Sequence, residues 1–119
     1  MPVPKIPLAE AMAQLQTLGP VRVLVSSGVA TAVLDGKLGF EQKGNDAVFS
    51  VGCACRISVP RERVRHVVLS EKEHDGANVA HAQLFDGNYD KLCALIFPQG
   101  VEGARQMVQK LDGNDFEIG

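Results

Sequence analysis

Residues Val79–Phe97 read VAHAQLFDGNYDKLCALIF, and the rest of the chain is organised around them. Two apolar-rich segments of seven residues flank a five-residue turn that opens on Asp86-Gly87. Glycine accepts the positive φ of tight turns and aspartate bonds its own backbone, so the stretch predicts a β-hairpin with a longer loop. Neither segment alternates between apolar and charged residues, which is typical of strands that are largely covered. The other segments are therefore expected to pack beside this hairpin or on top of it.

The chain before the hairpin predicts a run of strands. Its apolar residues recur at every second position, and Gly-, Asp- and Asn-rich turns separate the segments. The predicted strands are 21–26, 29–34, 37–43, 47–51, 53–59 and 64–70. Residues 71–78 are predicted to be a charged loop. Short turns between most strands require antiparallel neighbours.

A helix is predicted at each end of this run, because apolar residues recur there at spacings of three and four. The two stripes are Leu8, Met12, Leu15 and Leu18, and Val101, Ala104, Val108 and Leu111. Residues 115–119 are predicted to be frayed or to reach a neighbouring chain. The fold class is therefore α+β: a strongly twisted antiparallel meander of about eight strands, with the N- and C-terminal helices packed on it.

Length and composition predict one domain, residues 1–119. A net charge of −2, one Tyr and no Trp argue against nucleic-acid binding, which needs a basic stripe and stacking aromatics. No apolar run approaches the roughly 20 residues of a membrane span. The start, MPVPK, lacks a signal pattern, so a cytoplasmic protein is expected. Three cysteines, an odd number, fit free thiols in a reducing compartment.

Three segments share a pattern with a known family. Leu15–Val21 leads from a helix through Leu-Gly into a valine strand, and Val29–Leu38 ends in Asp-Gly-Lys-Leu. Ala82–Asp86 and Leu92–Phe97 form a Leu-Phe-Asp hairpin that leads into the last helix. In this order they resemble one half-unit of the HemS/ChuX/HutX haem-utilisation family, over most of the chain.

The resemblance implies a saddle-like antiparallel sheet with flanking helices, a homodimer, and cytoplasmic binding or transfer of haem in bacteria. Carrier-type members have a histidine ligand at the end of the strand that matches Val21–Ser26, whereas this chain has Ser26-Ser27. The strand that matches Cys53–Ser58 is histidine-bearing in some relatives and carries none here.

The predicted role is non-enzymatic haem carriage or storage. Some relatives degrade haem, but the sequence shows no nucleophile–base pair, phosphate loop or paired catalytic carboxylates. The alternative is a binding or scaffold module of the same fold, which serves another apolar ligand or a protein partner.

His66 and His81 are the candidate haem ligands, since histidine is the usual proximal ligand of haem iron. If their strands pair, alternation places both rings on one face of the sheet. The alternative at each position is a partly buried, hydrogen-bonded sheet histidine. His74, in the charged loop, is predicted to be solvated.

Arg56 is the third candidate, because arginine pairs bidentately with carboxylates such as propionates. It clusters around Pro60 with Arg61, Arg63 and Arg65; the alternative is charge that keeps an edge or loop soluble. Cys53 and Cys55 point the same way on a strand. No recognisable spacing completes the four ligands of a tetrahedral metal, so no metal site is predicted. Small buried hydrophobes are the preferred interpretation of these cysteines, with thiolate ligation as the alternative.

Overall fold

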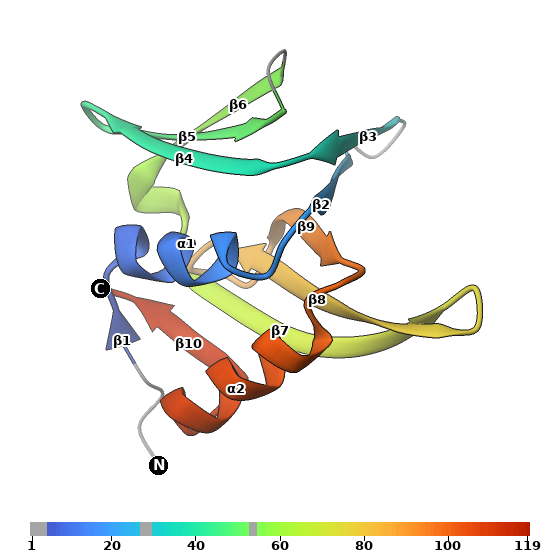
Figure 1. Cartoon of the computed structure of the whole chain (residues 1–119). Coiled ribbons are helices and arrows are strands. Elements are labelled where there is room, and N and C mark those ends of the chain that lie inside the picture. Colours follow the sequence, from blue (N-terminus) through green and yellow to red (C-terminus); the bar gives the residue numbers. More distant parts are fainter. Residues whose placement is uncertain (1–4, 27–29, 53–54) are drawn as a thin grey trace.

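The computed structural model describes residues 5–26, 30–52 and 55–119, which form two sheets and two α-helices (Figure 1). The large sheet has the strand order β1-β10-β7-β8-β9-β2-β3, and the small sheet has the order β4-β5-β6. All neighbouring strands pair antiparallel except β1 and β10, which are parallel. The strands are β1 (Lys5–Ile6), β2 (Val21–Ser26), β3 (Thr31–Gly36), β4 (Leu38–Lys43), β5 (Asp46–Val51), β6 (Cys55–Pro60), β7 (His66–His74), β8 (Ala77–Phe85), β9 (Lys91–Phe97) and β10 (Asp115–Ile118).

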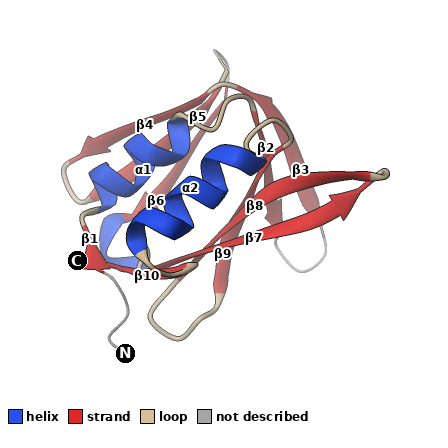
Figure 2. Ribbon diagram, turned by 60° about the horizontal axis from the view of Figure 1, so that its bottom comes forward, coloured by secondary structure: helices blue, strands red, loops and turns tan. Residues whose placement is uncertain are grey.

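Both predicted helices are present, as α1 (Leu8–Gln16) and α2 (Val101–Leu111), and a short 3-10 turn (Arg61–Arg63) follows β6. Figure 2 shows α1 and α2 side by side in front of the strands. In Figure 1 α1 lies between the small sheet above it and the large sheet below. Its buried residues Met12 and Leu15 belong to one core with Leu38 and Phe49 of the small sheet. The helix thus joins the two sheets through a shared apolar core.

The hairpin that the sequence predicted is confirmed. β8 and β9 pair antiparallel, with His81 opposite Ile96, and the register shifts at a bulge between Leu84 and Phe85. The connecting loop is organised by Asp86, whose Oδ1 accepts the backbone N–H groups of Asn88 (2.9 Å) and Asp90 (3.0 Å). This is the local bonding that favours aspartate in turns.

The predicted charged loop at 71–78 is wrong. β7 continues to His74 and β8 begins at Ala77, so the two strands form a long hairpin with a two-residue turn. The turn residues Asp75 and Gly76 have φ of 53° and 80°. Positive φ at both central residues is the geometry that suits a tight hairpin and favours Asp-Gly. The charged residues of this stretch lie on an exposed pair of strands, where water solvates their side chains as it would in a loop.

The prediction of a frayed tail is also wrong. β10 (Asp115–Ile118) pairs with β7 on one side and with β1 on the other. Phe116 has no exposed surface and Ile118 is buried, so their side chains belong to the core. The last residues therefore form an inner strand of the large sheet.

The fold class, α+β with terminal helices, is confirmed, but its strands do not form one meander. β9 returns to pair with β2, and β10 pairs with β7. The chain leaves the large sheet at Gly36, where an added Cβ would lie 2.8 Å from the Gly52 nitrogen. The Gly52 N–H donates to the Lys37 carbonyl at 3.0 Å. This close backbone approach turns the chain from β3 into the separate small sheet.

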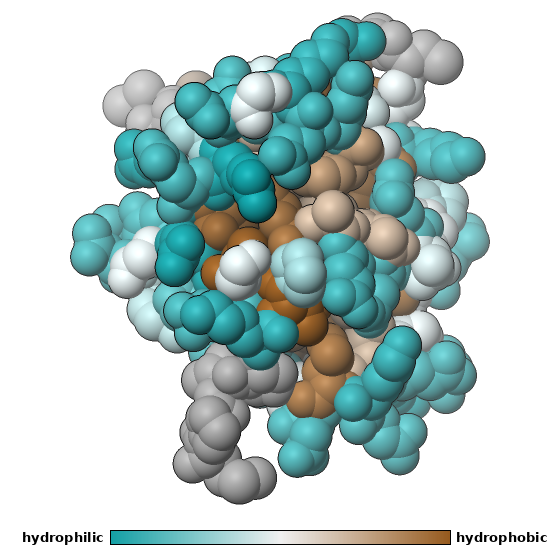
Figure 3. Space-filling view, turned by 90° about the vertical axis from the view of Figure 1, so that its left-hand side faces the viewer, coloured by the Kyte–Doolittle hydropathy of each residue, from teal (hydrophilic) through white to brown (hydrophobic). Residues whose placement is uncertain are grey.

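Apolar residues also reach the surface. Figure 3 shows the left-hand side of the view in Figure 1, where they gather in the middle of an otherwise hydrophilic face. None of the described helices has the length and apolar character needed to cross a membrane.

Candidate functional site

The large sheet has one face toward the helices and a second face that neither helix covers, called the helix-free face below. Cross-strand partners share a face, and successive residues along a strand point to opposite faces. Leu69, Ala82 and Leu95 lie in register on the helix side and are buried. The neighbouring row, Ser70, His81 and Ile96, continues to Arg22 and forms part of the helix-free face.

A pocket of about 340 Å³ lies on the helix-free face and is called the basic pocket. Lys72 and Lys91 contribute its charge, and the described residues that line it include no carboxylate. Lys72 is the cross-strand partner of Val79, which makes it a diagonal neighbour of His81. The lining residues are Leu24, Ser26, Thr31, Lys72, His81, Gln83, Lys91, Leu92, Cys93 and Ala94.

His81 is the buried polar residue of the basic pocket, with 7% of its surface exposed. Its Nδ1 is enclosed and has no hydrogen-bond partner among the described residues. Burial, followed by the positive charges of Lys72 and Lys91, lowers the pKa of His81 below its usual value. The ring is therefore neutral at pH 7, and Nε2 is the ring nitrogen that remains for contact with a bound molecule.

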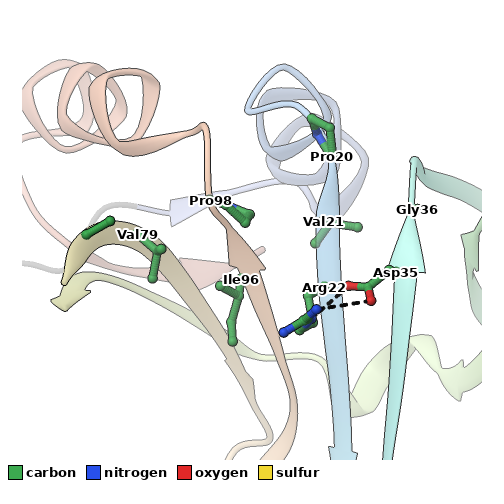
Figure 4. A pocket seen from close by; sticks show the side chains of 9 residues that line it. Pro20, Val21, Arg22, Asp35, Gly36, Val79, Ile96 and Pro98 are labelled. Carbon is green, nitrogen blue, oxygen red and sulfur yellow. Dashed lines mark hydrogen bonds and ion pairs between the residues drawn. The ribbon is translucent and has the colours of Figure 1, made fainter. Parts of the chain in front are cut away.

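A second pocket, of about 310 Å³, adjoins the basic pocket on the same face and is called the apolar pocket. Figure 4 shows Val79, Ile96 and Pro98 around it, with Arg22 turned toward Asp35. Arg22 Nε and Nη2 donate to the Asp35 carboxylate at 2.8 and 3.2 Å. This pairing compensates the arginine charge and leaves the neighbouring surface apolar.

The two pockets are contiguous. Ile96 of the apolar pocket is the cross-strand partner of His81 in the basic pocket. Lys72 and Val79, which are also partners, lie one in each pocket. A flat ligand on this face would therefore contact apolar surface at one end, with Lys72 beside that end and Lys91 at the far end of the basic pocket.

His66 and His81 share the helix-free face, as alternation predicts once β7 and β8 pair. They do not share a pocket, because Ser70, the partner of His81, lies four residues from His66, about 13 Å along the strand. His66 instead stacks on Tyr89, with ring centroids 4.1 Å apart, and its buried Nδ1 has no hydrogen-bond partner in the part of the chain that the structure describes.

Arg56 lies on β6 of the small sheet, where it is the partner of Ser50 and lines a small pocket of about 140 Å³ with Glu41. It therefore belongs to a different sheet from His66 and His81. Within the arginine cluster, Arg63 Nη2 lies 3.7 Å from Asp86 Oδ2. Arg61 and Arg65 line another pocket, next to Gly119.

The cysteines form no common site in the described residues. Cys53 lies outside them, Cys55 is half-buried on β6, and Cys93 is buried on β9 of the other sheet. Burial raises the pKa of Cys93 to about 11. The side chain of His74 also lies outside the described part. Within that part, no group of three or more His, Cys, Asp or Glu side chains could hold a metal ion.

Sequence reasoning missed Lys72 and Lys91. Lys72 fell in the stretch that was predicted to be a loop, and Lys91 was the first residue of the second hairpin segment, to which no site was assigned. Extending the alternation of β7 by two residues, from Ser70 to Lys72, would have put a lysine on the face of His81.

Searches of protein-family models and of curated proteins find no match to this sequence. Solved structures do match. ChuX has a TM-score of 0.75 and 12% identity over 90% of this chain and 75% of ChuX. A second structure, described as the heme-binding protein ChuX, has a TM-score of 0.67 and 13% identity over 89% of this chain and 72% of that one.

A protein from Erwinia carotovora matches at a TM-score of 0.70 and 12% identity, over 87% of this chain and 70% of its own. These identities are low, so the likeness concerns the backbone and not the site residues. The chain has the ChuX-like fold that the sequence resemblance implied.

Proposed function

We propose that this protein binds haem or a related tetrapyrrole on the helix-free face and carries or stores it. A tetrapyrrole is a flat apolar disc with carboxylates at one edge. The apolar pocket offers surface for the disc, and Lys72 and Lys91 offer cations for the carboxylates. The observation that carries the proposal is His81, a buried histidine that lines the basic pocket opposite Ile96 of the apolar pocket.

Two further observations support the proposal. One matching structure is described as a heme-binding protein. In addition, Ser26 lines the basic pocket, and it stands at the strand end where carrier-type members of the family have a histidine ligand. The donor set fits the carboxylate groups of a tetrapyrrole, since the described lining is cationic and has no carboxylate. Bound haem would supply the iron; the residues of this chain bind and orient the ring and exclude water from it.

The direct test is a titration with haemin, followed by absorbance in the Soret region. We expect a saturable shift at micromolar protein. Replacement of both Lys72 and Lys91 by Ala should weaken binding at least about tenfold, the loss expected for a charge-assisted hydrogen bond. Lys110→Ala is the matched control, because Lys110 is an exposed lysine on α2 that lines neither pocket.

His66→Ala is a second control, and its haemin affinity should equal that of the wild type, because His66 lies outside both pockets. A wild-type protein that shows no saturable shift would refute the proposed function. The same result would favour the alternative, a module of this fold for another apolar ligand or a protein partner. The departure that favours this alternative is Ser26 in place of the histidine of carrier-type members.

The proposal includes a homodimer in the bacterial cytoplasm. β3 is an edge strand of the large sheet, and its Val33 is 52% exposed. Exposed edge strands attract further strands unless they are charged or covered. Light scattering over a wide concentration range should give the mass of two chains, and the mass of one chain throughout would contradict this part.

A further inference from the structure

The basic pocket contains two cations without compensating charge. Neither Lys72 nor Lys91 takes part in an ion pair among the described residues. Arg22 on the same face, in contrast, is neutralised by Asp35. Lys72 and Lys91 line one pocket with the buried His81, one toward each side of it along the strands. Two such cations attract an anionic group, and carboxylates accept their hydrogen bonds well.

The surroundings of His81 are poor for a metal ligand. A histidine that ligates a metal through Nε2 normally donates its Nδ1–H to a carboxylate, a carbonyl or water, which fixes the ring and its tautomer. His81 Nδ1 is buried and has no such acceptor among the described residues. An enclosed N–H without an acceptor is costly. The favoured tautomer therefore carries its proton on Nε2, which makes this nitrogen a hydrogen-bond donor and not a metal ligand.

From this geometry we infer that the pocket recognises the carboxylates of its ligand, through Lys72, Lys91 and the Nε2–H of His81, and not the metal at the centre of the ring. The protein is thus a receptor for porphyrin dicarboxylates, with or without iron. This inference rests on the proposed function, because it concerns the same site. It differs from haem ligation in what it demands of the ligand: a carboxylate edge is required, and iron is not.

Three ligands distinguish recognition of the carboxylates from ligation of the iron. They are haemin, iron-free protoporphyrin IX, and haemin dimethyl ester, which keeps iron and lacks the free carboxylates. Each is titrated against the wild-type protein at micromolar concentration by absorbance and by equilibrium dialysis. We expect similar Kd values for haemin and protoporphyrin, within about threefold. The ester should bind at least about tenfold more weakly, since it loses the charge-assisted hydrogen bonds.

Variants add a second readout. His81→Gln should weaken haemin and protoporphyrin by the same factor, because it changes a donor that both ligands use. Axial ligation predicts instead that His81→Gln weakens haemin alone and shifts its Soret band. The double Lys72→Ala, Lys91→Ala variant should weaken both dicarboxylates, with Lys110→Ala as the control. Thermal unfolding of each variant without ligand confirms that it is folded.

The outcomes separate the inference from the proposed function. Haemin binding without protoporphyrin binding overturns the inference and leaves the proposed function standing. Equal affinities for all three ligands also overturn it, because the carboxylates would then contribute nothing. If none of the three binds, both the inference and the proposed function fail.

Discussion

Tyr89 stacks on His66, with ring centroids 4.1 Å apart and an interplanar angle of 17°, although Tyr89 has φ of 60°. Left-handed backbone is unfavourable for a bulky residue, so its surroundings must hold it. The Tyr89 N–H donates to the Asp86 carbonyl at 3.0 Å, inside the loop that the Asp86 side chain organises. The stack therefore ties the loop after β8 to the first residue of β7.

Removing this stack should destabilise the protein modestly. Tyr89→Ala is expected to lower the free energy of unfolding by about 1 kcal/mol, the range of an aromatic pair. Tyr89→Phe should change it by less than about 0.5 kcal/mol, because the Tyr89 hydroxyl lies 3.4 Å from Asp115 Oδ2, which is long for a hydrogen bond. Urea denaturation measures both. Equal losses in the two variants would show that the hydroxyl, and not the ring, matters.

The last strand should be essential to stability. Phe116→Ala is expected to lower the free energy of unfolding by about 3–5 kcal/mol, since it removes a side chain with no exposed surface. Glu117→Ala is the matched control on the same strand, and a change below about 0.5 kcal/mol is expected there. A loss below about 1 kcal/mol for Phe116→Ala would mean that the tail is not packed as described.

Two glycines near α2 should respond differently to alanine. A Cβ on Gly100 would lie 2.8 Å from Phe97 Cβ and 2.9 Å from both Leu18 Cβ and the Leu18 carbonyl oxygen. Gly100→Ala should therefore destabilise by about 1–3 kcal/mol, as overpacking does. A Cβ on Gly103 would meet only the Leu18 Cδ2 methyl, which can move, and alanine favours the helix by about 1 kcal/mol. Thermal and urea unfolding should therefore rank Gly103→Ala above Gly100→Ala; the reverse order would contradict the packing.

The lowered pKa of His81 predicts that the free energy of unfolding depends on pH. Its pKa in the folded state lies below the unfolded value of about 6.5, because of burial, Lys72 and Lys91. The unfolded state therefore binds more protons, and the free energy of unfolding falls as the pH drops below about 6.5. The fall should be smaller in His81→Gln when urea denaturation is compared at pH 7.5 and pH 5.5. Parallel curves for the two proteins would rule out His81 as the source.

Cys93 should be slow to react with alkylating reagents. Burial raises its pKa to about 11, so little thiolate forms at pH 8, and the thiolate is the reactive species. Cys55, which is half-buried, serves as the comparison in single-cysteine variants. Mass spectrometry of the native protein should show Cys93 modified more slowly than Cys55, and both should react quickly in urea. Faster modification of native Cys93 would contradict its burial.

Local patterns predicted the helices and the late hairpin because their causes are local. The stripe of α1 and the Asp86-Gly87 turn depend on residues a few positions apart, which a linear sequence displays directly. The same reasoning failed at Glu71–Lys72 and at Phe116, where a few charges and a short segment resembled a loop and a frayed end. Only pairing with distant strands gives those residues their conformation.

The residue pattern along the chain predicts the α+β class, both helices and the alternation that puts His66 and His81 on one face. Long-range pairing sets the rest: β9 returns to β2, β10 enters the sheet, and Lys72 and Lys91 line one pocket with His81 while Arg56 lies on another sheet. The difference lies in how far apart along the chain the interacting residues are. Periodicity and turn chemistry act between neighbours along the chain, whereas strand order depends on burying the whole apolar surface at once, and many pairings of the same strands satisfy the local rules equally well.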